Sequence, residues 1–429
     1  MAGIAFVKGR LARSWETFAH HAHGKRALER SASDRSRAGL DWTNFFMSDV
    51  QVGFGSFVAF YLAHLDWSQE RVGVVLAVGR LVGVVSLIPG GALLDAIRAK
   101  RGLAAAGIAM IAGAAVILAV HPTFVFVAAA EVLHGLTAGI LGPAVAAISL
   151  GLVGRHAMAT RVGRNHRFNA AGNVLTAGLM GVLGTYVAAN MIFVVAAILA
   201  IPAMVALAAI DGGEIDYRRA RNAGKDDGVR PHRIGQLLKN HALLWFAACI
   251  ALFQLADASM LPLVGEAVAR GAGSHSSLFM SALVVTPQIL VALLAPWVGY
   301  ASELWGRKPL LTVGFAIEIV RATLFGFADG GLPLILIQMF DGVSGAIVTV
   351  LTVVIVTDLT TGSGRFNLAR GTVSMVAGLA ASLSILVSGY ISQEMGRLPG
   401  FLSLAAVAAI ATAVVWLFVG ETKPGEYID

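Results

Sequence analysis

The stretch GYASELWGRKPL (Gly299–Leu310) is a short run of charged and polar residues between two long apolar segments. A looser version of it, GALLDAIRAKRG (Gly91–Gly102), begins 208 residues earlier in the chain. A polar phrase that occurs twice in an otherwise apolar chain indicates an internal duplication, and the rest of the sequence can be tested for the same offset.

The composition places the chain in a membrane. It has 429 residues, of which 57% are hydrophobic and 13% charged, whereas a soluble domain carries about 25% charged residues. Apolar runs of roughly 20 residues recur, which is the length a helix needs to cross a bilayer. These runs are continuous, while the strands of a membrane barrel alternate apolar with polar residues. The sequence therefore predicts an all-α polytopic membrane protein.

Polar segments divide the apolar sequence into twelve predicted transmembrane helices. They lie near residues 40–64, 69–97, 101–120, 122–153, 161–187, 188–209, 241–266, 275–301, 307–326, 331–361, 365–392 and 397–420. The Gly142-Pro143 pair interrupts the fourth run. The expected organisation is a basic tail (1–39), a six-helix bundle (40–210), a central linker (211–240), a second six-helix bundle (241–420) and a short tail (421–429).

The positions of the basic residues predict the orientation. With the N-terminus placed in the cytoplasm, 27 of the 32 Lys and Arg residues fall on that side, and the exceptions are Arg71, Arg80, Arg270, Arg321 and Arg397. Cytoplasmic loops carry this excess, so both termini are expected inside. The net charge of +7 is then a consequence of topology and gives no case for a nucleic-acid partner.

The tail and the single cysteine limit other functions. No long apolar core of a cleavable signal precedes residue 40. The cluster His20, His21 and His23 fits a solvated tail better than a weak metal site. One cysteine allows no intramolecular disulfide and no Cys/His metal motif. No P-loop segment occurs, so neither a nucleotide nor another cofactor is expected, and no metal site is predicted.

The 208-residue offset recurs outside the opening phrase. Asp49 pairs with Asp257 and Arg80 with Gln288 at 208, and Gly91, Asp95 and Lys100 pair with Gly299, Glu303 and Lys308 at the same offset. Glu131, His134 and Gly135 pair with Gln338, Asp341 and Gly342 at 207. A nearly constant offset across four pairs of helices indicates two related halves.

Two parallel six-helix repeats with these loops resemble the major facilitator superfamily. That family carries G-x-x-x-[DE]-x-x-G-R-[KR] between its second and third helices and often again between the eighth and ninth. The second copy fits through Gly299, Glu303, Gly306, Arg307 and Lys308. The first departs, with Arg98 at the second glycine and Ala99 at the arginine, followed by Lys100.

The resemblance implies a role for these loops. An acid at either loop, Asp95 or Glu303, can meet the positive N-terminal end of a helix in the other half. The expected cytoplasmic gate comprises Gly91, Asp95, Arg98, Lys100, Gly299, Glu303, Gly306, Arg307 and Lys308. The alternative is that these charges only satisfy the positive-inside bias.

Polar residues within the predicted helices mark the candidate substrate and proton-coupling site. An ionisable group at the centre of a membrane helix costs roughly 2.5–3.5 kcal/mol, so each one requires a partner or a cavity. The resemblance implies that the helices carrying them line a central cavity. The candidates are Asp49, Gln51, Arg80, Glu131, His134, Asp257, Gln288, Gln338 and Asp341.

Glu131 is the most informative of these candidates. It stands where the resembled fold often carries an arginine, with His134 on the same helix face. A carboxylic acid in a half-dry cavity and an imidazole can both exchange a proton near neutral pH. Two purely structural alternatives stay open. Asp49 and Arg80 could form an ion pair that only stabilises the fold, and Glu131 and His134 could hydrogen-bond each other and only fix helix packing. Glu318 and Arg321 are interpreted as a local pair on a scaffold helix.

The predicted function is secondary active transport by alternating access. The resemblance is to drug/proton antiporters, so we expect proton-coupled efflux of a small amphipathic organic molecule from a bacterial inner membrane, by a monomer. The alternative is proton-coupled import of a metabolite or siderophore-like organic anion. The basic residues Arg161, Arg164, His166, Arg167, Arg365 and Arg370 could attract an anion or merely obey topology. A membrane enzyme and a non-transporting sensor are the disfavoured alternatives.

Overall fold

The computed structural model describes residues 32–52, 58, 61–62, 65–186, 190–223, 239–271, 276–328 and 330–423. Every named element within these ranges is a helix. Ten helices or continuous helix pairs in this part of the chain are long and apolar enough to cross a membrane. The long helices α2 and α8 occupy the places of the predicted first and fifth spans, so the bundle follows the predicted twelve-span pattern.

Seven helices are named in the part of the first half that the structure describes. They are α2 (Asp34–Val52), α4 (Gln69–Ala96), α5 (Lys100–Val120), α6 (Phe124–Ala138), α7 (Leu141–Val153), α8 (Met158–Tyr186) and α9 (Met191–Ala209). Helix α2 begins at Asp34 rather than near residue 40. The fourth predicted span consists of α6 and α7, which separate just before Gly142-Pro143 because Pro143 has no N–H to continue the hydrogen-bond ladder.

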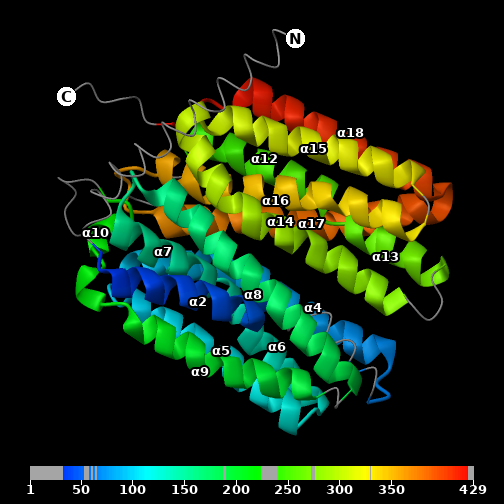
Figure 1. Cartoon of the computed structure of the whole chain (residues 1–429), viewed down its shortest axis with the longest axis horizontal. Coiled ribbons are helices and arrows are strands. Elements are labelled where there is room, and N and C mark those ends of the chain that lie inside the picture. Colours follow the sequence, from blue (N-terminus) through cyan, green and yellow to red (C-terminus); the bar gives the residue numbers. More distant parts are fainter. Residues whose placement is uncertain are drawn as a thin grey trace, which may run out of the picture.

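The second half repeats this pattern. Its helices are α12 (His241–Asp257), α13 (Met260–Gly271), α14 (Ser276–Trp305), α15 (Arg307–Phe327), α16 (Gly331–Leu359), α17 (Phe366–Met395) and α18 (Arg397–Phe418). Figure 1 shows the helices of the two halves as two stacked groups, with α8 and α14 at their boundary. Between the halves, the linker forms a 3-10 turn (Gly212–Glu214) and the short helix α10 (Tyr217–Ala220).

The outer surface of the bundle is apolar, as a lipid environment requires. Large side chains such as Val125, Ile201, Leu386 and Leu417 are exposed on it. Inside each half, apolar side chains including Ile108 and Phe193 in the first and Phe246 and Phe315 in the second are fully buried. Because lipid is as apolar as the core, close packing and polar contacts, rather than burial from water, must hold the helices together.

The most extensive contacts between the halves are those of α8 with α14 and of α4 with α17, and α8 also meets α16. A Cβ on Gly91 would lie 2.3 Å from the Asn367 carbonyl oxygen, and one on Gly299 would lie 2.4 Å from the Ala159 carbonyl oxygen. These two glycines therefore let the halves meet backbone to backbone, at equivalent positions in the repeat. We call this end of the bundle, with residues 91–101, 211–223 and 299–308, the gate end.

Candidate functional site

Three cavities between the halves lie next to one another and share lining residues, and we call this row of cavities the path. The largest, about 450 Å³, lies between α4, α6 and α17 and is lined by Arg80, Glu131 and His134 among others. His134, Leu87 and Ala138 also line the next cavity, of about 330 Å³. That cavity shares Gly142 and Arg370 with the third, of about 130 Å³. The path therefore runs from Glu131 to Arg370.

Glu131 lies at the wide end of this path and is almost fully buried, with 3% of its surface exposed. Its carboxylate packs against Gly79 on α4, where a Cβ would lie 2.3 Å from Oε2. Oε1 has no hydrogen-bond partner among the described residues. Arg80 lines the same cavity. A buried carboxylate with few donors favours its protonated form, which is a requirement for carrying a proton.

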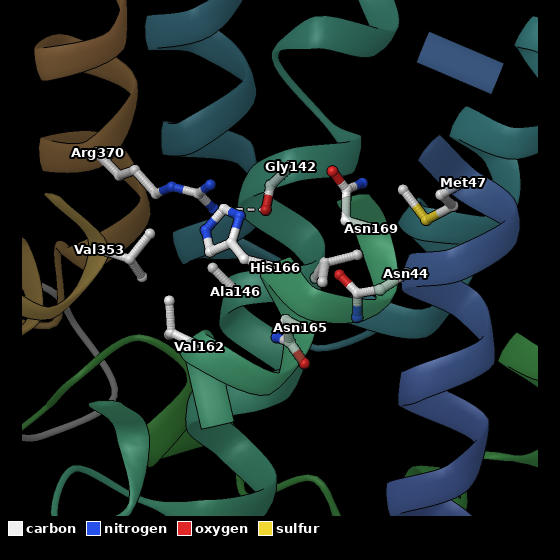
Figure 2. Close-up of a pocket in the computed structure, with 11 residues that line it drawn as sticks. Asn44, Met47, Gly142, Ala146, Val162, Asn165, His166, Asn169, Val353 and Arg370 are labelled. Carbon is white, nitrogen blue, oxygen red and sulfur yellow. Dashed lines mark hydrogen bonds between the residues drawn. The ribbon is translucent and has the colours of Figure 1, made fainter. Parts of the chain in front are cut away.

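Arg370 and His166 lie at the narrow end of the path, from opposite halves of the molecule. Arg370 Nη1 on α17 donates a 2.5 Å hydrogen bond to the Gly142 carbonyl oxygen on α7. Figure 2 shows His166 of α8 beside this guanidinium, with Asn44 and Asn169 on the far wall of the same cavity. One guanidinium, an imidazole and several amides here surround a cavity of about 130 Å³.

Asp41 on α2 is the acid closest in the fold to this end, and it already has partners. Arg161 on α8 donates to its Oδ1, and Arg164 donates to Oδ2 at 2.6 Å through Nη2. One carboxylate thus serves two guanidiniums. Arg161 also donates to Asn165 on its own helix. The bonds to Asp41 thus give Arg161 and Arg164 a structural role in joining α8 to α2, beyond the positive-inside bias.

Asp257 and Asp341 lie with Arg321, apart from the residues that line the three cavities. Arg321 Nη1 is 2.5 Å from Asp257 Oδ1, 3.0 Å from Glu318 Oε2 and 3.0 Å from Asp341 Oδ1. Gln338 accepts from Arg321 Nη2 at 3.2 Å and donates to Asp341 at 3.1 Å. We call these five residues the arginine cluster.

The arginine cluster changes the interpretation of two residues. The Glu318–Arg321 pair exists but is one part of a larger network that reaches α12 and α16. The three carboxylates lie close enough to hold a cation, but the Arg321 guanidinium already contacts each of them. The cluster has three carboxylates for one guanidinium, so its groups cannot all be charged in a low-dielectric interior without a large cost.

Three further candidates have other surroundings. Gln288 on α14 accepts a 3.1 Å hydrogen bond from Asn173 on α8 and so joins the two halves. Asp49 and Gln51 lie on α2, but the predictions for them fall outside the residues whose side chains the structure describes.

At the gate end, Asp95 is fully buried and caps a helix of the other half. Its Oδ2 accepts from the Leu368 N–H at 2.9 Å, and its Oδ1 accepts from Asn367 Nδ2 at 2.8 Å and the Asn367 N–H at 3.2 Å. Helix α17 has Arg365 at its N-cap and no cap bond from that side chain. Asp95 therefore supplies the missing cap across the interface.

The linker closes over this contact. The Tyr217 hydroxyl donates to the Asp95 or Ala96 carbonyl oxygen, each at 3.2 Å. Arg98 and Lys100 lie over the Tyr217 ring, at 5.3 and 5.2 Å from its centre. On the other half, Asn222 donates to the Thr357 carbonyl oxygen at 2.6 Å. The linker thus contacts both halves.

The second loop copy is organised around Gly306, whose φ of 95° favours glycine. Glu421 accepts from the N–H groups of Arg307 and Lys308, at 2.8 and 3.1 Å, and so caps α15. Glu303 is half-buried at the end of α14. In the first copy, Arg98 is not among the described residues with positive φ, so the departure from glycine accompanies a different turn.

Asp358 and Glu421 are gate-end acids that sequence analysis missed. Asp358 lies 3.3 Å from Arg307 Nε in its own half and 3.5 Å from Arg155 Nε in the first half. The available signal was a lone acid at the end of an apolar run, beside a basic loop. Its partner could not be named without the fold.

Two bundles around a shared polar cavity, with paired contacts at one end, define a transporter-type membrane protein. Residues 42–286 and 269–428 both match the Major Facilitator Superfamily. An uncharacterized MFS-type transporter found in two strains of Mycobacterium tuberculosis is 35% identical over 387 residues, covering 89% of this chain and 93% of that protein. The chain belongs to the major facilitator superfamily and is a transporter.

Two more distant proteins are also similar. The multidrug transporter protein MdtP of Bacillus subtilis is 26% identical over 134 residues, covering 31% of this chain and 25% of that protein. The crystal structure of the human organic anion transporter MFSD10 (TETRAN) superposes with a TM-score of 0.64 at 14% identity, covering 90% of this chain and 99% of that one. The latter likeness concerns the fold alone.

Proposed function

We propose that the chain exports a small amphipathic organic molecule in exchange for protons, by alternating access in a bacterial inner membrane. The gate end, with both termini, faces the cytoplasm in this proposal, in accord with the excess of basic residues there. Partial similarity to a multidrug transporter supports the direction of transport. The protein is proposed to act as a monomer.

The observation that carries the proposal is the Glu131 carboxylate. It is buried beside a cavity shared by both halves, and one of its oxygens has no described partner. Arg80, His134 and the apolar wall of α17 surround the same space. A proton on Glu131 is accessible to substrate there, so binding one can favour release of the other.

The arginine cluster is the second proposed proton store. With three carboxylates and one guanidinium, it holds at least one proton in its least costly state. Asp257 and Asp341 are its most accessible members, at 24% and 27% side-chain exposure. The cluster thus keeps Asp257 and Asp341 in the proposal, as proton carriers rather than as substrate ligands.

The experiment measures proton movement in liposomes that contain the purified protein and an imposed pH gradient. Pulses of lipophilic cations and organic acids are compared in wild type, Glu131→Gln and Asp257→Asn, with the exposed Glu70→Gln as matched control. We expect a substrate pulse to dissipate the gradient in wild type and control, and at least tenfold more slowly in Glu131→Gln. Substrate exchange with an untouched gradient would refute proton coupling.

Import of an organic anion is the second candidate function. The observation that favours it is Arg370, whose guanidinium forms no ion pair with the described carboxylates. The same liposomes decide the direction, because an exporter drives substrate against the proton flow and an importer drives it along with the flow.

A further inference from the structure

Arg370 is a charged group that the proposed proton exchange does not use. It reaches from α17 into the junction of two cavities, and its described hydrogen bond goes to a neutral carbonyl oxygen, that of Gly142. That bond fixes one N–H of the guanidinium. The planar group is thereby oriented, with further donors left for another partner.

The charges around the path are unequal. Asp41 is bound by Arg161 and Arg164, and Glu131 lies at the opposite end beside Arg80. Asp257, Glu318 and Asp341 contact Arg321 instead, and Arg370 forms no ion pair with a carboxylate among the described side chains. A guanidinium inside a membrane protein is costly when it lacks a counter-ion, so the narrow end of the path favours an anion.

The Arg370 guanidinium suits an anionic head group. One of its N–H groups is bound to the Gly142 carbonyl oxygen, and the others can contact the paired oxygens of a carboxylate or sulfonate. His166 of α8 lies beside the guanidinium, and Asn169 lies on the far wall of the cavity, as Figure 2 shows.

The other end of the path suits an apolar body. The largest cavity is walled by Leu76, Val84 and Leu87 on α4 and by Ile385 on α17. Its volume of about 450 Å³ lies within the range of small-molecule sites. Head group and body together describe a short amphiphile.

We propose that the path binds an organic monoanion, with its carboxylate or sulfonate on Arg370 and its apolar body between α4 and α17. This inference rests on the proposed function in one respect, that the path is the substrate cavity. It is independent of the coupling ion and of the direction of transport.

The test compares three amphiphiles with the same eight-carbon chain: octanesulfonate, octanamide and octyltrimethylammonium. Binding is followed by the shift in unfolding temperature of the protein in lipid nanodiscs, and the partitioning of each amphiphile into protein-free nanodiscs is measured and subtracted. The variants are Arg370→Gln, Arg370→Lys and the exposed neighbour Arg167→Gln. We expect octanesulfonate to bind wild type and Arg167→Gln at least tenfold more tightly than the other two amphiphiles.

Arg370→Gln is expected to lose this preference, and Arg370→Lys to keep part of it, because lysine retains the charge without the planar fork. Arg370→Lys keeps the test informative if the glutamine variant folds poorly. Equal binding of the three amphiphiles, no binding of octanesulfonate, or its undiminished binding to Arg370→Gln would overturn the inference.

The liposome assay separates this failure from that of the proposed function. Proton movement driven by octyltrimethylammonium, dependent on Glu131, would leave the proposed exchange standing and remove the anion site. Octanesulfonate binding that depends on Arg370, without proton movement by any amphiphile, would leave the anion site standing and refute the proposed proton exchange.

Discussion

The Asp95 carboxylate accepts the backbone N–H of Leu368 at 2.9 Å, although the two residues lie 273 positions apart and in different halves. The contact exists only while α4 and the start of α17 are together. Because Arg365 provides no side-chain cap of its own, opening the gate end exposes the N-terminus of α17. We therefore expect a stronger cap on α17 to favour the state in which the gate end is closed over the state in which it is open.

Asp95→Ala is therefore expected to favour opening of the gate end. Loss of an N-cap costs about 0.5–2 kcal/mol, which corresponds to roughly a 2- to 30-fold change in the equilibrium. The measurement is labelling of Ser374→Cys, in the middle cavity, by a charged maleimide added at the gate side, with Cys249→Ala removing the only native cysteine. An unchanged labelling rate would show that the cap does not hold the halves together.

Gly91→Ala and Gly299→Ala are expected to have the same effect on labelling by steric means. Each new methyl group would lie within 2.4 Å of a backbone oxygen in the other half, so the helices must separate. Gly389→Ala on α17 is the control, since nothing lies within 4 Å of its added Cβ. If Gly389→Ala raises the labelling rate as much as Gly91→Ala does, the higher helix propensity of alanine explains the effect, and the close approach of the two halves does not.

Arg321→Met is expected to destabilise the second half by about 3–5 kcal/mol, because it leaves buried carboxylates without their cation. The readout is thermal unfolding of the purified protein. Arg321→Met combined with Glu318→Met should recover part of the loss, since fewer buried acids remain. A single variant as stable as wild type would contradict the central place given to this guanidinium.

Glu214 provides a prediction of pH dependence outside the membrane-spanning helices. Its Oε2 accepts from the Ser33 N–H at 2.9 Å and the Ser33 hydroxyl at 3.1 Å. These donors, the backbone N–H first, hold the pKa of Glu214 below its ordinary value. The contact thus contributes stability above the pKa of the unfolded chain, about 4.3, and loses it as the pH falls through the lower folded value.

Amide hydrogen exchange at Ser33, corrected for its intrinsic rate, follows this contact. Protection is expected to stay constant from pH 7 to 5 and to fall as the pH drops below 4. Glu214→Ala should be poorly protected throughout. Protection that rises in acid would reverse the assigned sign.

Much of the fold follows from the sequence, because the constraints on membrane helices are strong. The lengths of the apolar runs, the 208-residue offset and the interruption at Gly142-Pro143 predict the helices and the duplication. The sequence offered Asp95 and Glu303 alike as acids for a helix N-terminus of the other half, and the structure shows that contact for Asp95. Gly135 and Gly139 lie against α4, where a Cβ on either would come within 2.5 Å of a backbone oxygen.

The sequence could not predict that the polar residues divide into those that line the cavities and those of the arginine cluster. A helix that is apolar all round carries no signal for the face that turns inward, so Asp257 and Asp341 could not be separated from Glu131. Arg370 and His166 satisfied the positive-inside bias equally well. Their meeting depends on how α8 and α17 pack, which one sequence does not encode in any local pattern.

The linker that joins Tyr217 to the end of α4, and Asn222 to the end of α16, has a kinetic consequence. If the halves rock as proposed, this segment detaches and docks again in each cycle, and the strength of its contacts affects the turnover rate in the same way for every substrate. Changes in the linker can therefore make such a transporter faster or slower while leaving its choice of cargo untouched.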